Sequence, residues 1–424
     1  MGLTKQLQKE NTGEAQILNS ATLPIADGGY NSQNIPALAS QQVAPLNSQE
    51  LQHIRTVTQN AYNESNYLQS LPGANINNLQ KPVVPIDGLN PEISALVVER
   101  MWRIVCVRNL YNFYTDSSLQ TLVNRACKHD WRLIQARFGV PTIEETVDMA
   151  VMGLYDIVFL IDDSGSMDIS ELSDDNLKRM QTARQIVSKI AFIATMTDPD
   201  GVVVRAYNDP KEGNGLSTVQ QVDAYFDGLI PNNGTPSGSS LRQKIIDPIV
   251  KPLLLNNELH RPILIINVTD GVPTVTPGID ECKELENVLL ETKQMFKNSK
   301  YGEFGISFSF VQVGTDEKAT EFLGYLDEHP IIGNFVDCTS SYLIEKKECE
   351  EKYKKTGHRN KQFTIPEYMI KLMIGSIDPV YDAKDESGSR QTVRGFFNNL
   401  FGYPQNVPVA QAYPVQYNNQ HYTR

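Results

Sequence analysis

An apolar run that ends abruptly in acidic and hydroxyl residues constrains this chain most. Residues 155–167 read Tyr-Asp-Ile-Val-Phe-Leu-Ile-Asp-Asp-Ser-Gly-Ser-Met. The run at 157–161 is typical of a strand that is buried on both faces of a parallel sheet. In an open α/β sheet, ligands bind at the carboxyl ends of such strands. Here that end carries only oxygen donors, the side chains of Asp162, Ser164 and Ser166, and such donors suit Mg²⁺ better than zinc.

The chain after this run alternates between helical and strand-like segments. We expect helices at residues 176–196, 219–229, 237–255, 280–298, 317–327 and 367–374, and strands at 201–207, 262–268, 305–313 and near 335. Alternating elements of these lengths predict a doubly wound, mostly parallel sheet with helices on both faces. We place this α/β domain at residues 154–386.

Three further regions flank the α/β domain. Residues 1–90 are rich in Asn and Gln, so we expect a disordered arm, although a short helix at 49–61 fits the sequence. Residues 91–153 predict a helical accessory region, with helices at 92–114, at 119–138 and from Thr142 to about 153. Residues 387–424 predict a disordered low-complexity tail, or an interaction tail that carries aromatic side chains. The Lys- and Glu-rich segment 345–361 predicts a solvated helix face or a loop insertion.

Charge and cysteine usage narrow the classes of function. The net charge of -12 argues against nucleic acid or an anionic membrane surface as a partner. No apolar run approaches the roughly 20 residues that span a bilayer, and the N-terminus lacks the pattern of a secretory signal. The five cysteines are scattered and form no Cys-x-x-Cys pair, so neither a disulfide framework nor a zinc site is indicated. We therefore expect a cytoplasmic protein.

Two more oxygen donors lie where a second strand and a loop would bring them to the same site. Thr235 lies in a Gly-Thr-Pro loop, and Asp270 follows the strong strand at 262–268. If the strands before Asp162 and Asp270 are parallel neighbours, their carboxyl ends bring both aspartates within reach of one ion. Mg²⁺ takes about six oxygens and keeps several waters. If most direct ligands are neutral hydroxyls, the ion stays electrophilic and can accept a partner's Asp or Glu.

The three motifs in this order resemble the metal-ion-dependent adhesion site of von Willebrand factor type A (vWA) domains. They are Asp-x-Ser-x-Ser, the Gly-Thr-Pro threonine and Thr-Asp-Gly, and the similarity extends over residues 155–386. Intracellular copine-like and fungal or protist members are similar also through Phe-Val-Gln-Val-Gly at 310–314 and Gly-Ser-Ile-Asp-Pro at 375–379. The calcium-binding C2 domains of copines and the zinc-bound RING of related plant ubiquitin ligases have no counterpart here.

The resemblance implies a Rossmann-like fold and a Mg²⁺ site, with Mn²⁺ as a substitute ion. The implied metal ligands are Asp162, Ser164, Ser166, Thr235 and Asp270. It also implies binding of a protein partner through an acidic residue. We expect a non-catalytic module that acts as an intracellular scaffold or assembly factor, and not an enzyme.

Three alternatives stay open at this point. A metal-dependent hydrolase or phosphotransferase on the same site would need a general base, but His260 is predicted at the opposite edge of the sheet and Asp163 is the only spare carboxylate. A structural component could assemble through its amide-rich arms. The site could also hold no metal, with Asp162 and the serines capping the next segment while Asp270 starts a turn.

Overall fold

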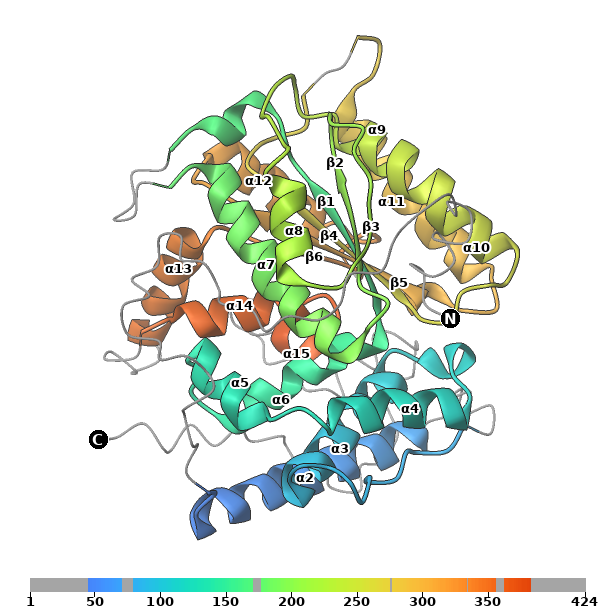
Figure 1. The fold of residues 1–424 in the computed structure, drawn as a ribbon. Coiled ribbons are helices and arrows are strands. Elements are labelled where there is room, and N and C mark those ends of the chain that lie inside the picture. Colours follow the sequence, from blue (N-terminus) through green and yellow to red (C-terminus); the bar gives the residue numbers. More distant parts are fainter. Residues whose placement is uncertain are drawn as a thin grey trace.

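The fold is built on one six-stranded sheet (Figure 1). The computed structural model describes residues 45–70, 79–170, 177–274, 277–333, 335–355 and 362–382. The strand order is β3-β2-β1-β4-β5-β6, and each neighbouring pair is parallel except β2 and β3. The expected mixed α/β fold with a mostly parallel sheet is therefore confirmed. The strands are β1 (Asp156–Ile161), β2 (Val202–Ala206), β3 (Gly213–Leu216), β4 (Ile263–Thr269), β5 (Ile306–Gln312) and β6 (Val336–Thr339).

The two central strands are β1 and β4, and their parallel pairing meets the condition under which Asp162 and Asp270 come together. They pair in parallel from Asp156 opposite Ile263 to Ile161 opposite Val268. Every residue of both strands is buried, which agrees with their mostly apolar sequences. The chain leaves β1 toward β2 on one side and returns at β4 on the other. The carboxyl ends of β1 and β4 therefore form the topological switch point, where open α/β sheets bind ligands.

Helices cover both faces of the sheet (Figure 1). One face carries α7 (Arg179–Thr197), α8 (Val219–Phe226) and α14 (Ile365–Ile374). The other carries α11 (Glu281–Lys297) and a continuous helical stretch made of α9 (Ser237–Leu241), the π-helical η6 (Arg242–Val250) and α10 (Lys251–Leu255). The other described α-helices that follow β1 are α12 (Glu317–Asp327), α13 (Tyr342–Lys355) and α15 (Pro379–Asp382).

A layer of helices lies at the amino ends of the strands, opposite the switch point (Figure 1). It contains α2 (Ser48–Gln69), α3 (Pro91–Val107), α4 (Asp116–Ala126), α5 (Trp131–Phe138) and α6 (Ile143–Asp148). A buried arginine, Arg103, pairs with Glu64 of α2 at 2.9 Å and with Asp378, beside α15, at 2.7 Å. This ion network joins the layer to the end of the α/β domain. None of the helices in the described ranges is long and apolar enough to cross a membrane.

Three expectations about secondary structure differ from the structure. Helix α2 falls inside the segment expected to be a disordered arm and continues to Gln69, because Ile54, Ala61 and Leu68 form a buried face against α3. The helix expected at 119–138 is two helices, since the Asp130 side chain accepts from the Arg132 and Leu133 N–H groups and starts α5. Strand β3 was not expected. The arm before residue 45 and the tail after residue 382 lie outside the described residues.

Candidate metal centre

The loop after β1 presents the first three candidate ligands. The Asp162 N–H donates to the Val268 carbonyl at 2.8 Å, which continues the β1–β4 pairing by one residue. The Asp162 carboxylate then accepts from the Ser164 N–H at 2.8 Å and from the Thr269 hydroxyl at 2.6 Å. These bonds fix Asp162 between the ends of β1 and β4. Both Asp162 and Ser164 are buried, whereas Ser166 is partly exposed.

Two serine hydroxyls connect the loop after β1 to the aspartate after β4. The Oγ atoms of Ser164 and Ser166 lie 3.1 Å apart. The Ser166 hydroxyl donates to Asp270 Oδ1 at 2.9 Å, across 104 positions of sequence. The parallel pairing of β1 and β4 thus brings four of the five predicted ligands together, as their positions in the sequence suggested.

Thr235 reaches the site through the backbone of its loop. The Gly165 N–H donates to the Asn233 carbonyl at 3.2 Å, so this loop lies against the Asp-x-Ser-x-Ser segment. The Thr235 N–H donates to the Thr274 hydroxyl at 2.7 Å, and the Thr274 N–H donates to the Thr235 carbonyl at 3.1 Å. Thr235 is therefore held between the loops that follow β1 and β4, and its side chain is buried.

Close packing of two helices behind Thr235 explains the small residues that follow it. A side chain on Gly238 would place its Cβ 2.4 Å from the backbone nitrogen of Leu285 in α11. The Ser239 hydroxyl and N–H both donate to the buried Glu281 carboxylate, at 2.6 and 2.9 Å. The start of α9 is thereby fixed on α11, and the loop that carries Thr235 has a rigid support.

Asp163 has a structural role that its place in the motif did not reveal. Its carboxylate accepts from the Asn208 N–H at 2.7 Å, from the Asn208 side-chain amide at 3.1 Å and from the Asp209 N–H at 2.8 Å. Its carbonyl accepts from the Asn232 N–H at 2.8 Å. Asp163 thus ties the loop after β2 and the Thr235 loop to β1, and this carboxylate is already occupied by donors.

The charge balance of the site favours a cation. Burial, reinforced by the nearby Asp270 carboxylate, raises the pKa of Asp162 from 3.8 to about 7, although its hydrogen bonds oppose this shift. Arg179 Nη1 pairs with Asp270 Oδ2 at 2.7 Å. Within the described ranges, Asp162 has no cationic partner. One buried carboxylate of the pair is therefore uncompensated, which is the situation that a bound divalent cation would relieve.

The donor set fits a hard cation and excludes a carboxylate- or thiolate-rich centre. Among the described residues, no group of three or more His, Cys, Asp or Glu is placed to hold a metal. The candidate centre instead combines two carboxylates, Asp162 and Asp270, with the hydroxyls of Ser164, Ser166 and Thr235. Ser164 starts the short η5 turn (Gly165–Asp168) without a side-chain capping bond, so its hydroxyl is not needed as a helix cap. Oxygen donors of this kind suit Mg²⁺ or Mn²⁺.

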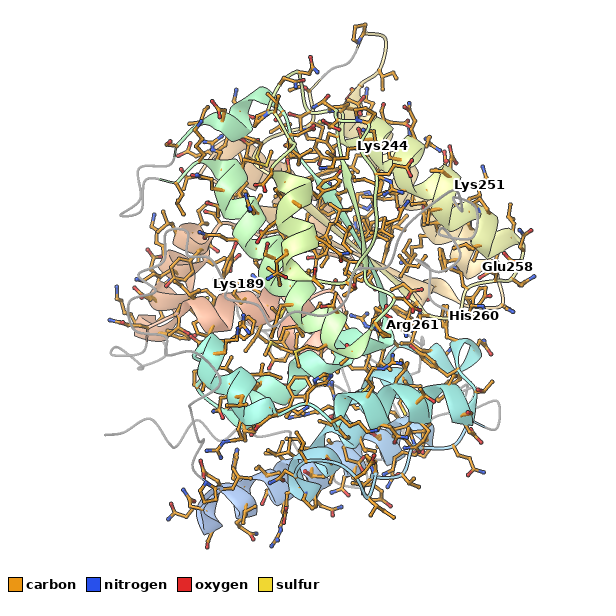
Figure 2. The ribbon with its side chains drawn as sticks, viewed as in Figure 1. Lys189, Lys244, Lys251, Glu258, His260 and Arg261 are labelled. Atoms are coloured by element: carbon orange, nitrogen blue, oxygen red, sulfur yellow. The ribbon has the colours of Figure 1, made fainter. Side chains whose placement is uncertain are left out.

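The histidines in the described ranges lie away from the candidate centre. His260 and Arg261 lie at the amino end of β4, whereas Lys244 lies toward the carboxyl ends of the strands (Figure 2). The His129 ring contacts the Met196 carbonyl at 2.7 Å, and His53 contacts Glu144. His329 Nδ1 accepts two backbone N–H groups of its own turn. His358 and His421 lie outside the described residues. The prediction that His260 lies at the opposite edge is confirmed.

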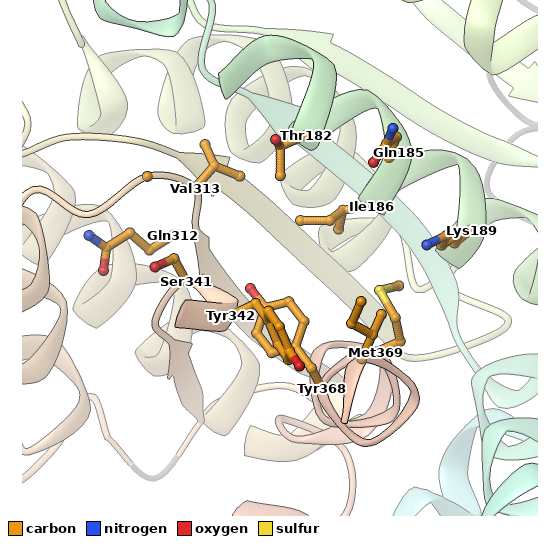
Figure 3. Close-up of a pocket in the computed structure, with 12 residues that line it drawn as sticks. Thr182, Gln185, Ile186, Lys189, Gln312, Val313, Ser341, Tyr342, Tyr368 and Met369 are labelled. Carbon is orange, nitrogen blue, oxygen red and sulfur yellow. The ribbon is translucent and has the colours of Figure 1, made fainter. Parts of the chain in front are cut away.

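A nearby cavity does not include the candidate ligands. It has a volume of about 80 Å³ and lies between α7, the end of β5 and α14, with Ile186, Val313, Tyr342 and Met369 in its lining (Figure 3). Ligand pockets for small molecules usually have volumes of about 300–1,000 Å³. This cavity is too small for such a ligand.

Sequence reasoning did not predict the contacts of four residues that shape the centre. Thr269 and Asp163 belong to the motifs themselves, but their partners depend on strand pairing. Thr274 follows the Thr-Asp-Gly motif and has no distinctive pattern around it. Arg179 is the first residue of α7, and a residue in the first turn of the helix after β1 is expected to face the switch point. The place of Arg179 in this first turn was therefore the one sign in the sequence that it could lie near the centre.

Comparisons with known proteins leave the family of this chain undetermined. No family model and no curated protein matches the sequence. Among solved structures, the pilus adhesin SpaC from Lactobacillus rhamnosus GG is similar with a TM-score of 0.30 and 15% sequence identity. That match covers 51% of this chain and 30% of the adhesin chain. A similarity at this level supports no inference about fold or function.

Proposed function

We propose that residues 154–386 form a vWA-type protein-binding module that holds Mg²⁺ and presents it to an acidic residue of a partner protein. The observation that carries this proposal is the convergence of Asp162, Ser164, Ser166 and Asp270 at the switch point of the sheet. Thr235 completes the ligand set from the adjoining loop. Bound there, Mg²⁺ would supply an electrophilic site for a carboxylate.

The surroundings of the centre favour binding over catalysis. A hydrolase or phosphotransferase would need a general base beside the ion. Asp163, a further carboxylate next to the ligands, already accepts three hydrogen bonds from backbone and amide donors. Within the described ranges no histidine contacts the centre. Among the residues that the structure describes, none is therefore placed to activate water beside the proposed ion.

Exposed apolar side chains on the site loops support a protein as the partner. Ile169 follows the Asp-x-Ser-x-Ser loop with 51% of its surface exposed, and Ile230 precedes the Thr235 loop with 73% exposed. Protein interfaces bury apolar side chains of this kind together with polar groups, so exposed isoleucines on the loops of the centre fit a protein partner. We propose that both isoleucines contact the partner.

The proposed setting is that of a cytoplasmic scaffold or assembly factor. All five cysteines are free thiols, which agrees with a reducing compartment. The net charge of -12 favours a protein over nucleic acid as the partner.

Affinity purification with and without metal tests this function. The full chain should capture a partner in Mg²⁺, and both EDTA and Ser164→Ala should release it, because each removes the ion. Ser217→Ala is the matched control, since Ser217 is a loop serine whose hydroxyl, among the described residues, bonds to Gln221 and to no candidate ligand. If a partner is still captured in EDTA and is also captured by Ser164→Ala, the metal takes no part in binding that partner.

A further inference from the structure

A protein cation already contacts one of the candidate ligands. Arg179 Nη1 lies 2.7 Å from Asp270 Oδ2, and the side chain of Asp270 is fully buried while that of Arg179 is 14% exposed. The distance and burial indicate a strong, charge-assisted hydrogen bond. Arg179 therefore belongs to the immediate environment of the metal centre.

The two aspartates of the centre differ in how their charges are compensated. Asp270 accepts from Ser166 on Oδ1 and from Arg179 on Oδ2. Asp162 accepts only neutral donors, the Ser164 N–H and the Thr269 hydroxyl, among the described residues. With Arg179 in place, the net charge of the carboxylate pair and its arginine is -1 instead of -2. A divalent cation entering the centre meets less negative charge, and Asp270 Oδ2 is already engaged by the guanidinium.

We infer that Arg179 sets the metal affinity of this centre by competing with the divalent cation for Asp270. This inference rests on the proposed metal site. The guanidinium compensates Asp270 when the ion is absent, so the metal-free form is stable. The same positive charge opposes a cation nearby, because two cations in a poorly solvated site repel each other. Binding is therefore weakened and readily reversible, and the centre responds to changes in metal concentration.

The neighbouring residue provides a matched control. Lys178 carries the same charge one position earlier, but its Nζ pairs with Asp168 Oδ1 at 2.6 Å and about half of its side chain is exposed. Replacing Lys178 removes one positive charge from the same part of the surface without touching Asp270. Comparing the Mg²⁺ affinities of the Arg179 and Lys178 variants separates the effect of the contact with Asp270 from the long-range effect of a surface charge, which solvent screens.

Isothermal titration of Mg²⁺ into the full chain tests the inference. Arg179→Met should bind Mg²⁺ at least tenfold more tightly than the wild type, and a tenfold change corresponds to about 1.4 kcal/mol. Lys178→Met should stay within about twofold of the wild type. Arg179→Lys should lie between the two, because it keeps the charge but loses the planar, directed donors.

Stability in the absence of metal gives a second measurement, in which Arg179→Met is expected to fall below the wild type although its Mg²⁺ affinity rises. In EDTA, Arg179→Met should unfold at a lower urea concentration than the wild type, since it leaves Asp270 buried without its partner. If Arg179→Met does not fold in EDTA, Arg179→Lys carries the comparison.

The outcomes distinguish this inference from the proposed function. Equal or weaker Mg²⁺ binding by Arg179→Met, with the wild type still binding, would overturn the competition and leave the metal site standing. Absence of Mg²⁺ binding by every variant would overturn both. Tighter binding by Lys178→Met to the same extent would show that general surface charge, and not the contact with Asp270, controls affinity.

Discussion

Replacing Asp162 with asparagine should stabilise the metal-free protein and abolish its response to Mg²⁺. Burial and the Asp270 carboxylate raise the pKa of Asp162 from 3.8 to about 7. At about 1.4 kcal/mol per pKa unit, this shift penalises the charged form by up to roughly 4 kcal/mol. Asparagine removes the charge and keeps an acceptor for the Ser164 N–H. The ionic hydrogen bond that Thr269 donates to Asp162 is lost, and the asparagine NH2 can instead donate a neutral bond to the Thr269 hydroxyl. We therefore expect a net gain of about 1–3 kcal/mol at pH 8.

The pH dependence of this gain follows from the direction of the shift. Between about pH 4 and pH 7 the folded protein keeps a proton on Asp162 that the unfolded chain has lost, so the stability of the wild type falls as pH rises through this window. The advantage of Asp162→Asn should thus be largest above pH 7 and should disappear toward pH 4. Bound Mg²⁺ reverses the order, because 1,000 times its Kd stabilises the wild type by about 4.1 kcal/mol and the variant has lost a ligand.

Urea unfolding in EDTA at pH 5 and pH 8, and at pH 8 in Mg²⁺, measures these differences. Asp168→Asn is the matched control, since Asp168 is an exposed aspartate of the same loop that pairs with Lys178. It should change stability little and leave the Mg²⁺ response intact. If Asp162→Asn lowers stability at pH 8 in EDTA, the buried carboxylate is stable without a cation, and the electrostatic reasoning fails.

Three further substitutions test the loops that hold the centre, the proposed partner-binding surface and the attachment of the helical layer. Asp163→Ala should lower the free energy of unfolding by about 2–4 kcal/mol in urea titrations, because it leaves buried donors unpaired. Ile230→Asp should weaken partner capture in affinity purification while the Mg²⁺ affinity in calorimetry stays unchanged, since Ile230 is exposed and supplies no ligand. Arg103→Met should cost about 3–5 kcal/mol in the same urea titrations, because Glu64 and Asp378 stay buried without their partner. An unchanged urea midpoint for Asp163→Ala or Arg103→Met, or unchanged capture by Ile230→Asp, would contradict the respective role.

The arrangement of the central strands could be predicted because local pattern and topology agree. The apolar runs of β1 and β4 are long enough to be recognised as buried strands, and both end in acidic residues. Their parallel pairing then places Asp162 and Asp270 at one edge, where Ser166 bridges them. The alternation of helices and strands was sufficient for the fold class.

Elements that depend on distant partners could not be predicted in the same way. Strand β3 has the sequence Gly-Asn-Gly-Leu and exists as an edge strand because β2 is available to pair with it. Helix α2 has few apolar residues, and its stability comes from packing against α3. The break before α5 did carry a signal, since Asp130 directly before Trp131 is a typical helix N-cap.

Site residues that belong to a local motif could be predicted, whereas contacts between residues that are distant in the sequence could not. Ser164, Ser166 and Thr235 were found from their motifs, whereas the partners of Asp163 come from loops that only the folded sheet brings near. Arg179 was missed because the sequence shows its place at the start of a helix but not the side chain that it contacts. Its role depends on Asp270, which lies 91 positions away in the sequence.

Counting bound Mn²⁺ by electron paramagnetic resonance tests the metal centre most directly. Mn²⁺ replaces Mg²⁺ at oxygen-rich sites, and the signal of free Mn²⁺ decreases when the ion binds. The wild-type chain at pH 8 should bind one Mn²⁺ that excess Mg²⁺ displaces, and Asp162→Ala should bind none at the same concentrations. Binding of one displaceable Mn²⁺ by both proteins, or by neither, would contradict a divalent metal site at the ends of β1 and β4.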